Sequence, residues 1–344
     1  MIWLTWRQLR VQAAAVFALV AASAIALAIT GPRLADLAKL DGSIFDRLTQ
    51  ADRNYFFTGI IVVAVAPAII GIFWGAPMVA RELEAGTHRL VWNQSVTRTR
   101  WLATKLGVTA LAASVAVGVL SLAVTWWAKP IDGALSGTHG SLPARLTPVS
   151  FAMRGIVPIG YAVFAVVLGV AIGLVVRRPL PAMAITLVLF IFVQIAVPLW
   201  VRPHLTTPVS DVITFSRDRL DGIQGNGAGQ PEKITVNTDG QGDWVLANET
   251  LNAKGQVTAL PSWFGDCLPP PPGPGGAERV AVVGSGDPIT ECLTRLNDEG
   301  YRQRVTYLPA DRFWRLQWLE TGMFLAVSAV LAWFCFWWTR RRLS

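Results

Sequence analysis

Charged side chains are scarce in this chain. Asp, Glu, Lys and Arg make up 15% of its 344 residues, whereas hydrophobic residues make up 53%. Soluble domains carry about 25% charged residues, so this composition excludes an ordinary soluble globular protein. Disordered chains have low hydrophobicity, so the hydrophobic content also excludes disorder over the whole length.

Residues that commonly catalyse reactions or bind metals are few. Three Cys are too few for a disulfide scaffold. His88, His139 and His204 fall in separate predicted loops and do not predict a metal site. The chain has no Walker-type loop, no Gly-x-Ser-x-Gly and no HExxH or CxxC pattern. We therefore expect no catalytic site, no metal and no cofactor in this chain.

Long uncharged hydrophobic runs are what the chain has instead. Each of six runs is long enough to cross ~30 Å of hydrocarbon as a helix. They are Val11–Thr30, Asn54–Ala80, Leu106–Ala128, Gly155–Val176, Pro179–Val201 and Thr321–Thr339. The sequence thus predicts an α-helical polytopic membrane protein with six transmembrane helices. The first run could also be a signal peptide, but its length and the two preceding Trp favour a retained span.

The distribution of Lys and Arg predicts the orientation in the membrane. One set of predicted loops and tails holds twelve cations against the two anions Glu82 and Glu84. The cations are Arg7, Arg10, Arg81, Arg89, Arg98, Arg100, Lys105, Arg177, Arg178, Arg340, Arg341 and Arg342. Cytoplasmic loops carry such an excess. We expect a cell-membrane protein with both termini cytoplasmic, and we attribute the net charge of +8 to this bias rather than to nucleic-acid binding.

Residues 202–316 are expected to form an extracellular domain between spans 5 and 6. Turn signals within 235–260 predict short strands, and Asp287-Pro288 and Gly300 predict the two ends of a helix. The segment therefore predicts a small mixed α/β insert. Residues 317–344 would then form span 6 and a basic cytoplasmic tail.

Two cysteines lie in this external segment. Thiols outside the cytoplasm usually pair, so we expect a disulfide between Cys267 and Cys292, with two free buried thiols as the alternative. Cys335 lies in span 6 and is expected to pack as a small apolar residue.

Aromatic residues flank the first and last spans. In residues 1–10, Trp3, Trp6 and Arg7 favour a cytoplasmic interfacial helix ahead of spans 1 to 5 in residues 11–201. An ordinary helix end with a Trp belt is the alternative. Trp314 and Trp318 are expected to anchor the outer end of span 6 in membrane lipid.

Ionisable residues within the spans would mark ion relays. Glu320 and Arg154 are the candidates, and both fall at span edges, where we interpret them as boundary residues. We therefore expect no ion coupling inside the membrane. If the protein pumps, its energy should come from a partner.

The largest predicted cytoplasmic loop is 81–105. Its first residues can continue the helix of span 2, Gly86 permits a left-handed cap, and Thr87 can cap a following short helix. Leu90 and Trp92 would give that helix an apolar face. A helix held between two spans can move both when a partner presses on it.

The order Glu-x-Glu-x-Gly-Thr, an apolar turn, Ser/Thr-Arg and a Lys entering a helix resembles the coupling region of type-2 ABC exporter permeases. The positions that carry this resemblance are Glu82, Glu84, Gly86, Thr87, Leu90, Ser95, Thr97, Arg98 and Lys105. It implies that 81–97 docks a separate ATPase subunit, which holds ATP and Mg, and that Trp92 fills a groove there. It also implies a second permease copy or a paralogue.

Three functions are compatible with these features. The first is the permease subunit of an ATP-driven ABC exporter that moves an amphipathic or hydrophobic substrate outward. The second is a membrane sensor whose domain at 202–316 binds an extracellular ligand. The third, a membrane-embedded enzyme, is the least favoured because no catalytic constellation is present.

Overall fold

The computed structural model describes residues 2–39, 48–87, 97–134, 143, 145–225, 231–238, 240, 242–267 and 288–342. Two compact units make up the chain. A helical unit contains Met1–Thr206 and Asp311–Ser344, and the second unit is Thr207–Ala310. The division lies a few residues inside the expected segment 202–316, because the residues at both of its ends pack with the helices.

Six helical stretches in the described residues are long and apolar enough to cross a membrane, as predicted. They are built from α1 (Ile2–Leu37), α3 (Gln50–Ile70) with η1 (Gly71–Gly75) and α4 (Ala76–Glu84), α6 (Arg98–Ala134), α8 (Val157–Val176), α9 (Pro179–Ala196) with η2 (Val197–Val201) and η3 (Arg202–His204), and α11 (Phe313–Arg341). A short helix, α7 (Pro148–Ala152), precedes α8.

Helix α8 forms the centre of the helical unit. In its most hydropathic stretch 72% of the residues are buried, against 17% in α1 and 22% in α9. The α8 sequence is rich in Gly, Ala and Val, so neighbouring helices approach it closely on several sides. Helices α1 and α9 leave rows of large apolar side chains exposed, which suits helices that face lipid or another membrane subunit.

Helix α8 packs very closely against the π-helical turn η1 and the start of α4. A Cβ built on Gly169 would lie 2.6 Å from the backbone oxygen of Gly71, and one on Gly173 would lie 2.6 Å from that of Ala76. Only glycine fits at such distances. The wide turn at η1 therefore packs backbone to backbone against α8.

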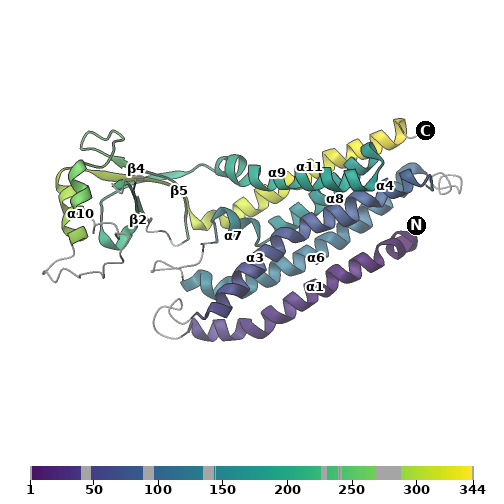
Figure 1. The fold of residues 1–344 in the computed structure, drawn as a ribbon, viewed down its shortest axis with the longest axis horizontal. Helices are drawn as coiled ribbons and strands as arrows, with labels where there is room; N and C mark the ends of the chain where they lie inside the picture. The colour runs from purple at the N-terminus through teal and green to yellow at the C-terminus, as the bar shows by residue number, and fades with distance from the viewer. Residues whose placement is uncertain are drawn as a thin grey trace, which may run out of the picture. The chain divides into compact units, whose positions relative to one another are not determined.

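The first ten residues do not form a separate interfacial helix. Helix α1 runs unbroken from Ile2 to Leu37, because no helix-breaking residue separates the amphipathic start from the apolar run. Trp3 and Trp6 are exposed, and the guanidinium of Arg7 lies 5.3 Å from the centre of the Trp3 ring. Within the helical unit, the start of α1 and the end of α11 lie at the same end (Figure 1).

The second unit is a small mixed α/β fold, as expected. Three antiparallel strands form a sheet in the order β1 (Val209–Ile213), β5 (Arg302–Leu308) and β4 (Trp244–Leu251). A second antiparallel pair joins β2 (Leu220–Gly225) to β3 (Pro231–Val236). The predicted helix is α10 (Pro288–Asp298), and Gly300 follows it with a φ of 82°. Short 3-10 turns are η4 (Arg217–Arg219), η5 (Ser262–Cys267) and η6 (Ala310–Arg312).

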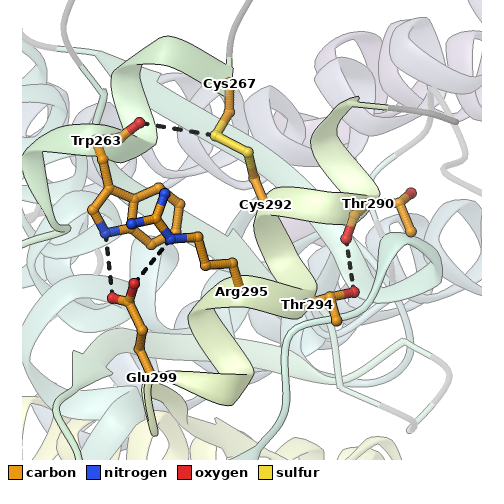
Figure 2. The surroundings of a disulfide bond; sticks show 7 residues. All are labelled: Trp263, Cys267, Thr290, Cys292, Thr294, Arg295 and Glu299. Carbon is orange, nitrogen blue, oxygen red and sulfur yellow. Dashed lines mark hydrogen bonds and ion pairs between the residues drawn. A yellow bond between two sulfur atoms is a disulfide. The ribbon is translucent and has the colours of Figure 1, made fainter. Parts of the chain in front are cut away.

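The predicted disulfide is present. Cys267 at the end of η5 is bonded to Cys292 of α10, with their Cα atoms 6.3 Å apart. Figure 2 shows the bond beside Trp263, whose indole nitrogen donates to Glu299 while Arg295 lies over its ring. The crosslink thus fixes α10 against η5 over a small apolar core. Cys335 is buried and free, as expected.

Buried amides join the sheet to the β2–β3 pair. Gln303 of β5 donates to the backbone oxygen of Ile234 at 3.0 Å, and Asn248 of β4 donates to that of Val236 at 2.9 Å. Thr250 donates to the Gln303 side-chain oxygen at 3.0 Å. Asn248 begins an Asn-Glu-Thr sequence of the glycosylation type, but its buried amide is already used inside the fold.

Candidate functional site

The segment that resembles a coupling region lies where α4 ends and α6 begins. Helix α4 ends at Glu84, and Gly86 follows with a φ of 69°, the left-handed conformation that the sequence predicted. A Cβ at Gly86 would meet no atom of the described residues within 4 Å, so in this part of the structure the backbone angle is what favours glycine. Leu90, Trp92 and Ser95 lie outside the described residues.

Glu82 lies at the centre of a polar cluster that joins three helices. Its Oε1 accepts hydrogen bonds from Nζ of Lys105 on α6 and from Nε2 of Gln8 on α1, the latter at 3.0 Å. Its Oε2 accepts one from the indole nitrogen of Trp101 at 3.2 Å. A single carboxylate of α4 thus holds α1 and α6, which the sequence alone did not indicate.

The partner of Glu82, Lys105, is almost fully enclosed. Its side chain is 4% exposed and that of Glu82 is 15% exposed. Nζ of Lys105 also donates to Oε1 of Gln8 at 3.2 Å and lies 5.4 Å from the centre of the Trp101 ring. Removal of one partner from a buried ion pair leaves an uncompensated charge, which costs about 3–5 kcal/mol. The pair therefore holds together the two helices that flank the segment between α4 and α6.

The other described residues that carry the resemblance to a coupling region are more exposed than Lys105. Glu84 and Thr87 are exposed, and the Thr87 hydroxyl donates to the backbone oxygen of Glu82 at 3.5 Å. Arg98, the first residue of α6, is half-buried. Among the predicted acidic residues, then, Glu84 faces outward and Glu82 faces into the helical unit.

A second buried cluster lies in the helical unit, and sequence reasoning missed it. Arg202 of η3 and Glu320 of α11 are both fully buried and form two hydrogen bonds, Nε to Oε2 at 2.8 Å and Nη2 to Oε1 at 3.0 Å. Tyr161 of α8 donates its hydroxyl to Oε1 of Glu320. Nη1 of Arg202 donates to the backbone oxygen of Pro148 at 2.8 Å, and the guanidinium lies 4.4 Å from the Phe151 ring centre.

Glu320 lies at the end of a hydrophobic run, as the sequence indicated, but its carboxylate is buried in an ion pair with Arg202 rather than exposed to solvent. A signal existed in the sequence. Arg202 directly follows the fifth hydrophobic run and Glu320 directly precedes the sixth, so both fall at the same predicted end of consecutive spans. Opposite charges at matching depths favour pairing.

Arg154, which precedes α8, is likewise buried rather than exposed to solvent. It is 1% exposed, and its Nη1 donates to both carboxylate oxygens of Asp132 at 2.6 and 2.8 Å. Its guanidinium lies 5.1 Å from the centre of the Phe56 ring on α3. This pair joins the end of α6 to the loop ahead of α8.

Gln317, which belongs to α11, caps the start of α8. Its Oε1 accepts from the backbone nitrogens of Ile156 and Val157 at 2.9 and 3.0 Å. The free amide groups at a helix start need such partners. Gln317 on α11 therefore holds the end of α8 that lies next to the Arg202 cluster.

None of these clusters resembles a metal centre. Across the described ranges, no three His, Cys, Asp or Glu residues come together in a way that could hold a metal ion. The clusters pair one acid with one base, an arrangement that positions helices.

The comparisons with known proteins agree with the resemblance of the loop. Residues 8–202 match the family described as ABC-2 membrane transporter related. Searches of curated proteins and of solved structures found no match. The matched region holds five of the six spanning stretches and the whole segment 81–105 with its Glu82 cluster. It spans more than half of the chain, which therefore belongs to the ABC-2 membrane transporter related family and is a permease-type transport subunit.

Proposed function

We propose that this chain is the permease subunit of an exporter driven by ATP, and that a separate ATPase subunit docks on residues 81–97. The family match supports a transport role rather than that of a sensor or an enzyme. ATP and Mg would be held by the ATPase subunit, because the chain has no Walker-type loop.

The Glu82 cluster is the observation that carries this proposal. An ATPase must pass its movement to the permease through a structural contact, and the segment between α4 and α6 has both ends tied to the same cluster. Glu82 belongs to the incoming helix, Lys105 and Trp101 belong to the outgoing one, and Gln8 connects α1. A displacement of the segment would therefore move three spanning helices together.

The proposed orientation places this segment on the cytoplasmic side. Twelve cations lie in the loops and tails assigned to that side, against two anions. Both ends of the chain lie at one end of the helical unit (Figure 1). The unit Thr207–Ala310 would be extracellular, a location that agrees with its disulfide.

A second permease copy, or a paralogue, would complete the transport path. Helices α1 and α9 expose large apolar side chains along their length, among them Leu19, Ile29, Val188 and Phe192. Such faces suit a contact with another membrane subunit or with lipid. A path lined by apolar helices favours an amphipathic or hydrophobic substrate, which would move outward.

Co-purification with the ATPase subunit tests the docking site. Glu84→Arg reverses an exposed charge, and Gly86→Val forbids the left-handed turn. Trp92→Ala removes the expected apolar anchor, and loss of such anchors costs an interface about 2 kcal/mol or more. All three should release the ATPase or abolish substrate-stimulated ATP hydrolysis while the permease still inserts.

Glu232→Arg is the matched control, since it makes the same charge reversal at an exposed site in the other unit. It should leave the complex intact. Normal assembly and normal stimulated hydrolysis in Glu84→Arg, Gly86→Val and Trp92→Ala would refute the docking assignment.

A further inference from the structure

A pocket of about 240 Å³ lies beside the Glu82 cluster, between α1, the π-helical turn η1, α4 and α6. The coupling proposal does not use it. The pocket belongs wholly to the helical unit, and its lining changes in character along the helices that form it. That change indicates the kind of molecule that would fit.

Polar groups line the end of the pocket near the start of α1 and the end of α4. Gln8 and Gln12 come from successive turns of α1, and Arg81 comes from α4. Gln8 is already bonded to Glu82 and Lys105. The amide of Gln12 and the guanidinium of Arg81 have no hydrogen-bond or ion-pair partner within the described part of the chain. Both are therefore available to a ligand.

Apolar groups line the opposite end of the pocket. Phe73 and Trp74 come from η1, and Pro77 comes from the first turn of α4. Residues 73 and 81 are eight positions apart, which corresponds to about 12 Å along a helix. Phe73 is 48% exposed while Trp74 is 2% exposed. The apolar wall is thus open towards the outside of the helical unit, where membrane lipid would lie.

The charge at the polar end is positive. Glu82 and Lys105 lie next to each other and neutralise one another, so among the described residues Arg81 sets the net charge that a ligand would meet. A phosphate group suits an arginine and neighbouring amide donors. The adjoining apolar wall suits an acyl chain. A small soluble anion has no apolar group that could contact this wall.

We propose that this pocket binds one anionic phospholipid taken from the surrounding membrane leaflet. The phosphate lies against Arg81 and the amide of Gln12, and one acyl chain runs along Phe73 and Pro77. The proposal rests on the membrane placement of the helices, and it does not require the docking of an ATPase. Its test can therefore fail or succeed independently of the coupling assignment.

Native mass spectrometry of the full chain in detergent tests the proposal. The probes are a phosphatidylglycerol, a phosphatidylcholine with the same acyl chains, and soluble glycerol phosphate. We expect one phosphatidylglycerol to be retained preferentially over phosphatidylcholine, and glycerol phosphate not to compete. A cation near the membrane surface contributes about 1 kcal/mol to anionic-lipid binding, so Arg81→Gln should weaken retention about five-fold.

Arg178→Gln is the matched control, because it removes one exposed cation outside the pocket. It should retain the lipid as the unchanged chain does. Gln12→Leu, which removes the amide but keeps an apolar volume, should weaken retention as well and decides the question if Arg81→Gln does not insert. Equal retention of both lipids, equal losses in Arg81→Gln and Arg178→Gln, or competition by glycerol phosphate would overturn the proposal.

Discussion

Arg202 and Glu320 are separated by 118 positions in the sequence, yet they form an ion pair with both side chains fully buried. Arg202 lies at the end of the fifth spanning stretch and Glu320 lies in the sixth, so the pair joins the two helical stretches that flank the unit Thr207–Ala310 in the sequence. Tyr161 adds α8 to the pair. The inserted unit therefore leaves and re-enters the helical unit at residues held close together.

Removal of one member of this pair should destabilise the helical unit strongly. Arg202→Met and Glu320→Gln each leave the other group without its partner, at a cost of about 3–5 kcal/mol. The double variant should lose less than the sum of the single losses, because no lone buried charge remains. The midpoint of thermal unfolding of the full chain in detergent measures these losses of stability. Arg315→Met, at an exposed site in α11, should have little effect.

The Glu82–Lys105 pair should behave as an internal contact and not as part of the ATPase interface. Glu82→Gln and Lys105→Met should lower thermal stability even in the absence of an ATPase, because each leaves one buried charge unpaired. Glu84→Arg should leave that stability unchanged and affect only assembly. A chain in which Glu84→Arg unfolds as early as Glu82→Gln would show that the two carboxylates do not have separate roles.

The contact of α8 with η1 should tolerate no side chain. Gly169→Ala places a Cβ against backbone atoms, and overpacking of this kind costs about 1–3 kcal/mol. Gly322→Ala is the control, since a Cβ there meets no atom within 4 Å and alanine favours the helix. The midpoints of thermal unfolding of the two variants measure this difference in stability. A neutral Gly169→Ala would mean that the helices separate more easily than the backbone contacts indicate.

The Cys267–Cys292 bond should stabilise the unit Thr207–Ala310. It closes a loop with a sequence separation of 25, for which the chain-entropy estimate is about 3–4 kcal/mol. Cys267→Ser or Cys292→Ser should make this part of the full chain more sensitive to protease. Cys335→Ala should leave the crosslinked peptide intact in mapping without reductant. Recovery of both thiols alkylated in the native protein would contradict the bond.

Labelling with a membrane-impermeant thiol reagent checks the orientation. In a Cys335→Ala background, a cysteine replacing the exposed Lys254 should react from outside the cell. A cysteine replacing the exposed Glu84 should react only after the membrane is permeabilised. The reverse pattern would invert the topology and remove the docking site from the cytoplasm.

The sequence by itself determined the six spanning stretches, the small mixed insert, the disulfide and the turn at Gly86. These follow from local patterns, since the length of an uncharged run decides whether a helix can cross a membrane. In the same way, the left-handed turn depends on one residue type. The loop also carried enough of its family's residue order to predict the ABC-type permease that the family match supports.

The tertiary structure alone decided how the polar side chains pair. Whether Glu82 faces a partner or faces Lys105, and whether Glu320 meets water or Arg202, depends on how each helix is rotated and packed against its neighbours. No spacing within one helix contains that information, because it is set by contacts between segments far apart in the chain. The close approach at Gly169 and the pocket beside Arg81 arise from the same packing.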